Sequence, residues 1–435
     1  MSSPTVTLHQ DMDPRDLLVV VLIGAHRLVA LLGCLHATMG ARTLDSRELA
    51  VDWHDLEEID QRAKLKEVVR LVCAKHDVEP QGIFISFSDI RVGSRLVDGQ
   101  VNFPGVPHAI TRHEMDWALR LAEEKPLGTD EELIDLVPVG WSTHGQVSRS
   151  TISATDLLQQ KRTYPLGVEC QGLSCHALQI IGAVGQKEQL SRLVQSAGFS
   201  CEGVIAQPAA LYRGIASSLE GHSSLIIDCG AKHTSFLIRL GDRLVQVRTF
   251  EYGGDDITKR IADNLGLNWD QAEKLKRQVN ILPGGEAAEP GAKVIPFHAK
   301  GQQTIFATIQ AEVDTLLPEV AKICRDAINE FFTARAQEFI DDPNHPLPKK
   351  CQIHLVGRAS QLAGLTTVLE TIFTHKVILG SGKANRNVGD ELSGLMLTGL
   401  LVSAVDQRRQ HQAREGRGLR QHLRTAWAWL IRPVE

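Results

Sequence analysis

Two turns, far apart in the sequence, carry residues of the kinds that bind phosphate groups. Gly24 lies between two apolar runs in LLVVVLIGAHRLVALLG, and Gly230 lies between two more in SLIIDCGAKHTSFLI. A glycine turn between two strands presents backbone N–H groups that can surround an anion. Because the strand–turn–strand unit occurs twice, the sequence predicts a duplicated body in which the two turns face each other across a cleft.

The side chains around the two turns differ. Asp228 precedes the second glycine and could hold a magnesium ion or a water, whereas Leu22 takes the matching position in the first turn. Arg27 follows the first glycine and could pair with a phosphate. Lys232 follows the second, where it could neutralise a phosphate or fill the space of one. The pattern predicts a phosphate site with Asp228 as its metal ligand.

Five further residues downstream of the second turn are candidates for binding a nucleotide. A Gly-Gly pair precedes a helix, whose first N–H groups attract anions. An acid and a lysine three residues apart share a face of the next helix and could reach a ribose or a base. A last glycine ends the strand QIHLVG. These residues are Gly253, Gly254, Glu273, Lys276 and Gly357. Each could also be an ordinary turn or a solvated ion pair, but their order along the chain favours the site.

The composition limits the classes of protein to which the chain can belong. A length of 435 residues with 43% hydrophobic and 23% charged content is typical of a globular protein with two domains or lobes. A net charge of −5 argues against nucleic acid as a partner. Eight scattered cysteines without a C-x-x-C pair predict buried, reduced thiols. No signal peptide is expected, and LLVVVLIGA is too short to cross a bilayer.

Helices and two insertions surround the repeated unit. The amphipathic segments DLEEIDQRAKLKEVVRLVCAKH and DDITKRIADNLGL are predicted helices, one after each unit. In the first insertion, Thr111 and Glu114 form a capping box at the start of a helix, and ELIDLVPVGWSTHGQ follows as a strand. The second insertion holds a long helix that Pro318 is expected to kink or divide. The sequence thus predicts an α/β fold with a small α+β subdomain inserted in its first half.

These segments together resemble a known family. DCGAKHTSFLI, VRTFEYGGDDITKRIADNLGLNWDQAEKLKR and HLVGRASQLAGL resemble the second half of the actin-like cell-division family FtsA. ITRHEMDWALRLAEE and DLVPVGWSTHGQ look like its 1C (SHS2) subdomain. The pilus-assembly relative PilM resembles the same stretches. The resemblance implies a bilobal, actin-like (duplicated ribonuclease-H-like) fold with a C-terminal amphipathic helix.

The resemblance also implies a division of the chain into subdomains. We expect a disordered N-terminus at 1–16, domain 1A at 17–88 and 173–220, the 1C insertion at 89–172, domain 2A at 221–280 and 351–405, subdomain 2B at 281–350, a linker at 406–417 and a membrane-targeting helix at 418–435.

By the same resemblance, the chain would bind ATP with magnesium in the cleft and polymerise at the cytoplasmic face of the inner membrane, at the division site. It would tether FtsZ through an FtsZ C-terminal peptide near residues 281–350 and contact other divisome proteins through 1C. Gln207, in the motif QPAA, matches a helix start that can position an attacking water. No nucleic-acid partner is expected.

The nucleotide motifs depart from the family pattern. Leu22 and Ala25 replace an acid and a hydroxyl residue in the first turn. Lys232 and His233 replace a small residue and a threonine in the second, and Arg358 stands where a second glycine is expected. Loss of the acid removes a metal contact, so we expect weak or absent ATPase activity.

The C-terminal segment RGLRQHLRTAWAWLIRPVE is predicted to bind anionic membrane lipids as an amphipathic helix. Aliphatic residues fall on one stripe, tryptophans flank it, and arginines lie opposite, a pattern suited to the headgroup boundary. These residues are Leu419, Leu423, Leu430, Trp427, Trp429, Arg420 and Arg424. The alternative is a helix that packs back onto the body. One copy should bind lipid weakly, and a polymer firmly.

Two other functions remain open from the sequence. A PilM-like cytoplasmic component of pilus assembly would capture a short peptide from a membrane protein. An actin-superfamily ATPase or sugar kinase would need cleft acids that hold Mg²⁺. The missing first acid and the 1C-like insertion count against an enzyme of this kind.

Overall fold

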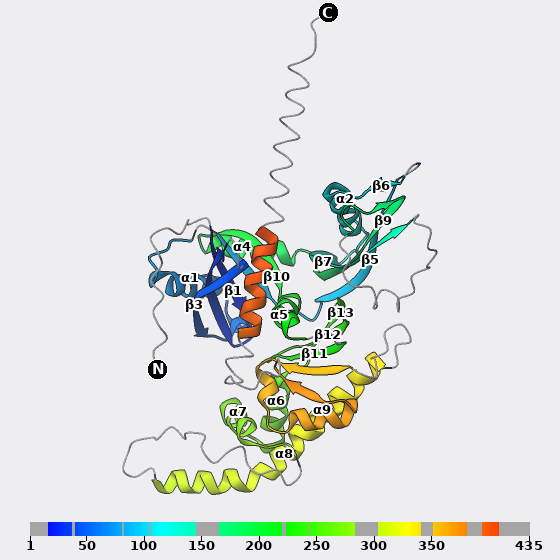
Figure 1. Cartoon of the computed structure of the whole chain (residues 1–435). Coiled ribbons are helices and arrows are strands. Elements are labelled where there is room, and N and C mark those ends of the chain that lie inside the picture. Colours follow the sequence, from blue (N-terminus) through cyan, green and yellow to red (C-terminus); the bar gives the residue numbers. More distant parts are fainter. Residues whose placement is uncertain are drawn as a thin grey trace, which may run out of the picture.

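The computed structural model shows two lobes and an inserted subdomain (Figure 1). It describes residue 105 and residues 16–36, 40–80, 82–103, 107–144, 165–219, 223–241, 243–282, 303–340, 351–380 and 394–408. The N-terminus expected to be disordered, 1–16, lies outside these residues except for residue 16, and the predicted membrane helix at 418–435 lies wholly outside them. Within them, no helix is both long and apolar enough to cross a membrane.

The first lobe is built on a five-stranded sheet in the order β10-β4-β1-β2-β3. The strands are β1 (Leu17–Ile23), β2 (Arg27–His36), β3 (Gly40–Ala50), β4 (Gly82–Phe87) and β10 (Ser200–Ala206), and the helices are α1 (Glu58–Ala74), α4 (Gln186–Ser196) and α5 (Gln207–Ile215). β1 and β2 form the first predicted hairpin, antiparallel from Leu17 opposite Cys34 to Ile23 opposite Leu28.

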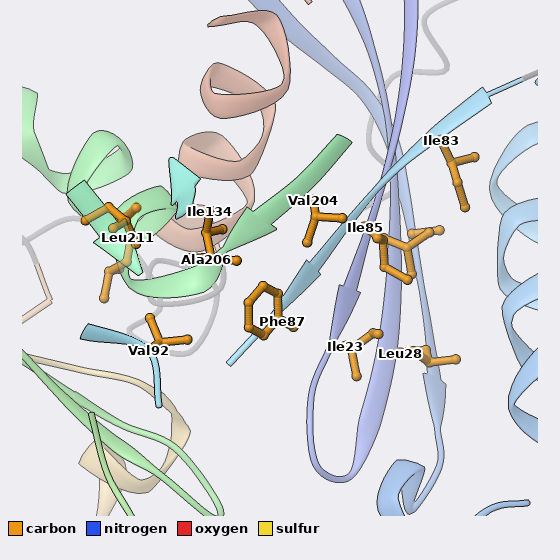
Figure 2. Close-up of a cluster of buried hydrophobic side chains, with 14 of the residues drawn as sticks. Ile23, Leu28, Ile83, Ile85, Phe87, Val92, Ile134, Val204, Ala206 and Leu211 are labelled. Atoms are coloured by element: carbon orange, nitrogen blue, oxygen red, sulfur yellow. The ribbon is translucent and has the colours of Figure 1, made fainter. Parts of the chain in front are cut away.

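The apolar run of β1 is explained by burial on both faces of the sheet. One face contributes Val19, Val21 and Ile23 to a core with α1 and α4, and the other contributes Leu18 and Val20 to a core with a helix at 394–408. Figure 2 shows Ile23 and Leu28 beside the turn that carries Gly24, with Phe87 at the end of the neighbouring strand. A sheet covered on both faces requires a continuous apolar strand, and this places the first turn at the edge of the core.

The second lobe repeats the hairpin within a larger sheet, in the order β15-β14-β11-β12-β13. The strands are β11 (Ser224–Cys229), β12 (Thr234–Leu240), β13 (Arg243–Phe250), β14 (Gln352–Val356) and β15 (Val377–Leu379), and the helices are α6 (Gly254–Leu265), α7 (Trp269–Gln278), α8 (Gln303–Ile340) and α9 (Leu365–Phe373). Pro318 lies inside α8, which continues past it, so of the two predicted alternatives, a kink or a division, the helix is not divided. Figure 1 shows α8 changing direction along its length, as a kinked helix does.

The inserted subdomain follows the order strand, helix, strand, strand. Its elements are β5 (Gly93–Asn102), α2 (Arg112–Glu123), β7 (Glu131–His144) and β9 (Gly172–Ala183), and a small ribbon joins β6 (His108–Ala109) to β8 (Glu169–Cys170). The predicted capping box of Thr111 and Glu114 opens α2, with Ile110 and Met115 buried on either side of it. One bridge between Arg248 and Gly93 joins this sheet to that of the second lobe.

Two expected boundaries differ from the sheet pairing. The resemblance places residues 173–183 in domain 1A, but β9 pairs along its length with β5 and β7 of the insertion. Residues 394–405 were assigned to domain 2A, but this helix packs on the first lobe. The helix also extends to residue 408 within the expected linker, where Arg408 pairs with Glu202. An apolar strand or helix has the same sequence pattern whichever sheet it packs against. Sequence pattern alone therefore cannot show to which domain such an element belongs.

The cysteines agree with the sequence prediction. All eight are free thiols, and only Cys201 is partly exposed. Burial raises the pKa of Cys73 to about 11 and that of Cys175 to about 12. These thiols therefore serve as small core residues.

Candidate cleft between the two lobes

A cavity of about 1700 Å³ lies between the lobes and is lined by both hairpin turns. Four segments from the two lobes meet there: the β1–β2 turn, the β11–β12 turn, the start of α6 and the end of β14. The residues predicted for the site all line it except Gly253, namely Gly24, Arg27, Gln207, Asp228, Gly230, Lys232, Gly254, Glu273, Lys276 and Gly357. The fold thus brings the sequence-predicted set together.

The two turns close with the same backbone hydrogen bond. The Gly24 N–H donates to the Arg27 carbonyl at 2.8 Å, and the Gly230 N–H donates to the His233 carbonyl at 2.9 Å. Among the described residues, no acceptor is found for the N–H groups of Ala25, His26, Ala231 and Lys232. Free N–H groups at two opposed turns are suited to phosphate oxygens.

Asp228, next to last in β11, lies beside Gly357, which directly follows the neighbouring β14. A side chain on Gly357 would meet the Cys229 carbonyl at 2.3 Å and the Asp228 carboxylate at 2.6 Å, and its φ is +85°. Only glycine fits here without strain. Burial raises the pKa of Asp228 to about 6, and the charge of Arg27 partly offsets this rise.

The acids of the cleft do not form a metal site. Within the described residues, no three histidine, cysteine, aspartate or glutamate side chains are arranged to hold a metal ion. Leu22, buried at the end of β1, has no ligand atom, and Asp228 has Arg27 as its charged neighbour. Magnesium prefers several oxygen ligands in octahedral geometry, so this donor set does not fit it. The prediction of Asp228 as a metal ligand is not supported by these neighbours.

The N–H groups at the start of α6 are used within the protein. Gly253 donates to the Asp256 carboxylate at 2.8 Å, and Gly254 donates to the Gly230 carbonyl at 3.0 Å. A side chain on Gly253 would lie 2.1 Å from the Ala231 carbonyl. The Gly-Gly pair therefore holds the second turn against α6. Contrary to the prediction, its N–H groups are not available to a phosphate.

Glu273 and Lys276 do share a face of α7, and they contact each other. The Lys276 ammonium lies 2.6 Å from the Glu273 carboxylate and donates to the Gly254 carbonyl at 2.9 Å. Thr258 donates to Glu273 at 2.6 Å. Burial raises the pKa of Glu273, but the bonds from Lys276 and Thr258 outweigh it and hold the pKa below its usual value. This network ties α7 to α6 at the wall of the cavity.

Gln207 starts α5 at the back of the cleft. Its side-chain amide donates to the Ile23 carbonyl at 2.5 Å, and the residue is buried. The amide nitrogen thus joins α5 to the end of β1. A role in positioning water would rest on its carbonyl oxygen and on the second N–H of the amide.

Two ionic bridges across the cleft were not predicted from the sequence. The His26 imidazole, in the first turn, lies 2.5 Å from Asp52 in its own lobe and 2.9 Å from Asp255 at the start of α6. The carboxylates raise the pKa of His26 to about 9, Asp255 first, against the opposing effect of burial. Because both ring nitrogens face carboxylates, the imidazole is protonated at neutral pH.

The second bridge centres on Glu48 of β3. Its carboxylate accepts from Arg27 of its own lobe at 3.2 Å and from Arg358 of the second lobe at 2.8 Å. Burial, then the charge of Arg358, lowers the pKa of Arg27. Arg358 was singled out only as a departure from the family pattern, and no sequence signal pairs it with Glu48, 310 positions away.

One lysine and two histidines also line the cavity. Lys232, His233 and His54 line it, and burial followed by the charges of Lys232 and His233 lowers the pKa of His54. Burial also lowers the pKa of His233. Among the described residues, Lys232 has no hydrogen-bond or ion-pair partner, so its charge is available to a ligand.

Comparisons with known proteins identify the relatives of the second lobe. Residues 225–397 match the family model described as cell division protein FtsA. The chain is 23% identical over 313 residues to the cell division protein FtsA of Streptococcus pneumoniae, covering 69% of this chain and 62% of that protein. It is also 23% identical over 203 residues to that of Bacillus subtilis, covering 45% of this chain and 43% of that protein. The chain thus spans less than two thirds of either relative.

A solved structure resembles nearly the whole chain. The PilM-PilN type IV pilus biogenesis complex matches with a TM-score of 0.54 and 16% identity, over 89% of this chain and 98% of that one. At this identity the likeness shows the fold, which is the bilobal actin-like fold expected from the sequence. The chain therefore has an actin-like fold, and its second lobe is similar to the FtsA family.

Proposed function

We propose that this FtsA-like protein is a cell-division adaptor that polymerises on the cytoplasmic face of the cell membrane and tethers FtsZ filaments to it. The match of residues 225–397 to the FtsA family model carries the proposal, because that range spans almost the whole second lobe. The adaptor would act by contact, at the division site, and its cleft would bind nucleotide as an assembly ligand. In the described residues, no set of acids is gathered to bind a metal ion, and this supports a nucleotide that is bound without being hydrolysed.

The proposed membrane contact is the C-terminal tail. Residues 417–435, which lie outside the described part of the chain, combine the aliphatic stripe, tryptophans and arginines of an interfacial helix. The described chain ends in the helix at 394–408, which is anchored on the first lobe. Such a tail would start from a fixed point of the body, and a polymer would present many copies to the membrane.

The proposed FtsZ contact is the 2B-like region at 281–350, of which the structure describes α8. The inner face of α8 packs into the second-lobe core through Val320, Cys324 and Ile328. Lys322 is exposed on the same helix. A substitution at Lys322 would therefore change the surface offered to a peptide without disturbing the core.

Further division partners are proposed to bind the inserted subdomain. Trp117 is 45% exposed on α2, beside a small hollow of about 250 Å³ formed with His113 and Leu121. Exposed tryptophans next to such hollows are enriched at protein interfaces, so this face of α2 is the surface proposed for these partners.

Co-sedimentation of FtsZ filaments with vesicles that contain anionic lipid tests the tether. We expect FtsZ to pellet with vesicles when the whole chain is present. A chain that ends at residue 408 keeps the described body and should leave both proteins in solution. Lys322→Glu should keep the protein on the vesicles but lower the pelleted FtsZ several-fold. Lys66→Glu makes the same charge reversal on the exposed face of α1 and should behave as the unmodified chain.

Two results would contradict the tether. If the chain that ends at 408 pellets with vesicles as well as the whole chain, the tail is not the anchor. If FtsZ stays in solution while the whole chain is bound to vesicles, the chain does not tether FtsZ.

A second candidate function is a cytoplasmic component of pilus assembly that binds a peptide from a membrane protein. The structural likeness to the PilM-PilN complex favours it. Fluorescence anisotropy with two labelled peptides separates the candidates: an FtsZ C-terminal peptide should bind if the first proposal holds, and a pilus-protein N-terminal peptide if the second does.

A further inference from the structure

The cleft has two features of a phosphate site and lacks a third. Its two turns present N–H groups without acceptors in the described chain, at Ala25, His26, Ala231 and Lys232. Cationic side chains line the same cavity. The missing feature is a set of oxygen ligands for magnesium, since Leu22 replaces an acid. Phosphates in this cleft would therefore bind to backbone N–H groups and cationic side chains, and not to a metal ion.

The cationic side chains that line the cavity come from both lobes. Arg27 comes from the first lobe, and Lys232 and Arg358 come from the second. Arginine and lysine bind phosphate through charge-assisted hydrogen bonds without a metal. In a site with three such side chains, much of the phosphate charge is already neutralised, so a bound Mg²⁺ would add less to affinity.

Several cationic side chains of the cavity form ion pairs with carboxylates of the chain itself. Glu48 contacts both Arg27 and Arg358, and Asp255 contacts His26 across the cleft. A carboxylate on an arginine occupies the place that a phosphate oxygen would take. Asp52 keeps His26 paired within the first lobe even if Asp255 is displaced. An incoming polyphosphate thus has to replace Glu48 and Asp255, and it finds Lys232 without a partner among the described residues.

We propose that the cleft binds a nucleoside polyphosphate without a divalent metal ion, its phosphates replacing the carboxylates of Glu48 and Asp255 on the cationic side chains. This inference deepens the proposed function only in its nucleotide-binding part and does not depend on the tether. Arg27, Lys232 and Arg358 hold the phosphates, and the N–H groups of the two turns complete the site.

Isothermal titration calorimetry of the whole chain tests this proposal, with ATP as the probe in EDTA or in excess Mg²⁺. We expect ATP to bind in EDTA at least as tightly as with Mg²⁺. Lys232→Gln should weaken binding in EDTA about tenfold, since it removes one charged hydrogen-bond donor. Glu48→Gln should strengthen binding several-fold, because a competing carboxylate is lost. Lys66→Gln, the same change on the exposed face of α1, should leave affinity unchanged.

Three outcomes would overturn the proposal: binding that requires Mg²⁺, adenosine binding as tightly as ATP, or no binding of ATP in either condition. A Glu48→Gln variant that binds ATP more weakly would also contradict the exchange of carboxylates for phosphates. Vesicle and FtsZ co-sedimentation does not use nucleotide affinity as its readout, so failure here leaves the tether to be judged separately.

Discussion

The two hairpin turns of the cleft share a backbone and differ in chemistry. Each closes with a hydrogen bond from its glycine to the residue three positions on, at 2.8 Å in the first and 2.9 Å in the second. The first turn follows a leucine and ends in Arg27, whereas the second follows Asp228 and carries Lys232. The two turns thus share a backbone hydrogen bond but not their side chains. The bond depends only on the local backbone, whereas the binding properties of each turn depend on its side chains.

The surroundings of the turns differ as well. The second turn is packed against its neighbours, since Gly357 approaches Cys229 and Gly253 approaches Ala231. The first turn is more open, and a side chain on Gly24 would meet only Arg27, at 3.1 Å and beyond. The second turn should therefore be the less tolerant of change, and substitutions can test this contrast.

The largest expected effect is that of Gly357→Ala. The new methyl group would overlap the Cys229 carbonyl at 2.3 Å, and the φ of +85° adds strain. We expect a loss of about 3 kcal/mol or more in unfolding free energy, measured by urea denaturation. Gly24→Ala, in the open turn, should cost at most about 1 kcal/mol.

Gly185→Ala is the matched control for backbone strain. Its φ is +83°, but a methyl group there meets nothing within 4 Å. It should cost about 1 kcal/mol. Equal losses at positions 357 and 185 would mean that the second turn is not tightly packed.

Asp228→Asn is expected to have the next largest effect, with a dependence on pH. The pKa of Asp228 is raised from 3.8 to about 6 in the folded chain. A raised carboxyl pKa stabilises the fold below pH 3.8, and this stability is lost as the pH rises through 6. At neutral pH the variant should be more stable than the unmodified chain, by up to about 3 kcal/mol.

The measurement is the urea midpoint of both proteins at neutral pH and near pH 4, where their difference should shrink. Asp263→Asn removes an exposed acid of α6 and should show no such trend. A less stable Asp228→Asn variant at neutral pH would show that the carboxylate is stabilised by favourable contacts such as its attraction to Arg27.

The sequence predicts the elements of the cleft better than its contacts. Apolar period, turns and the Thr111 capping box are local signals, and the hairpins and helices that they predict are present. The pairing of β9 with the insertion and the bond from the Gly254 N–H to the Gly230 carbonyl of the second turn depend on which elements meet. The bridges of Glu48 and His26 join residues of different lobes, and no local pattern marks such pairs.

His26→Gln is expected to have the smallest effect and tests the bridge between the turns. The pKa of His26 is raised from 6.5 to about 9, so its pairing stabilises the fold fully below 6.5 and is lost as the pH rises through 9. The side chain is 42% exposed, so solvent screening limits the gain to about 1 kcal/mol at most. Thermal midpoints of the two proteins should differ near pH 6 and converge above 9.

Asp255→Asn separates the bridge across the cleft from the pairing within the first lobe. It removes the partner in the second lobe and leaves Asp52, 2.5 Å from the imidazole, in place. If the bridge between the lobes provides the stability, Asp255→Asn should reproduce most of the His26→Gln effect, and added salt should reduce both. An Asp255→Asn variant with an unchanged pH profile would assign the stability to Asp52, and the first turn would then be stabilised by its own lobe alone.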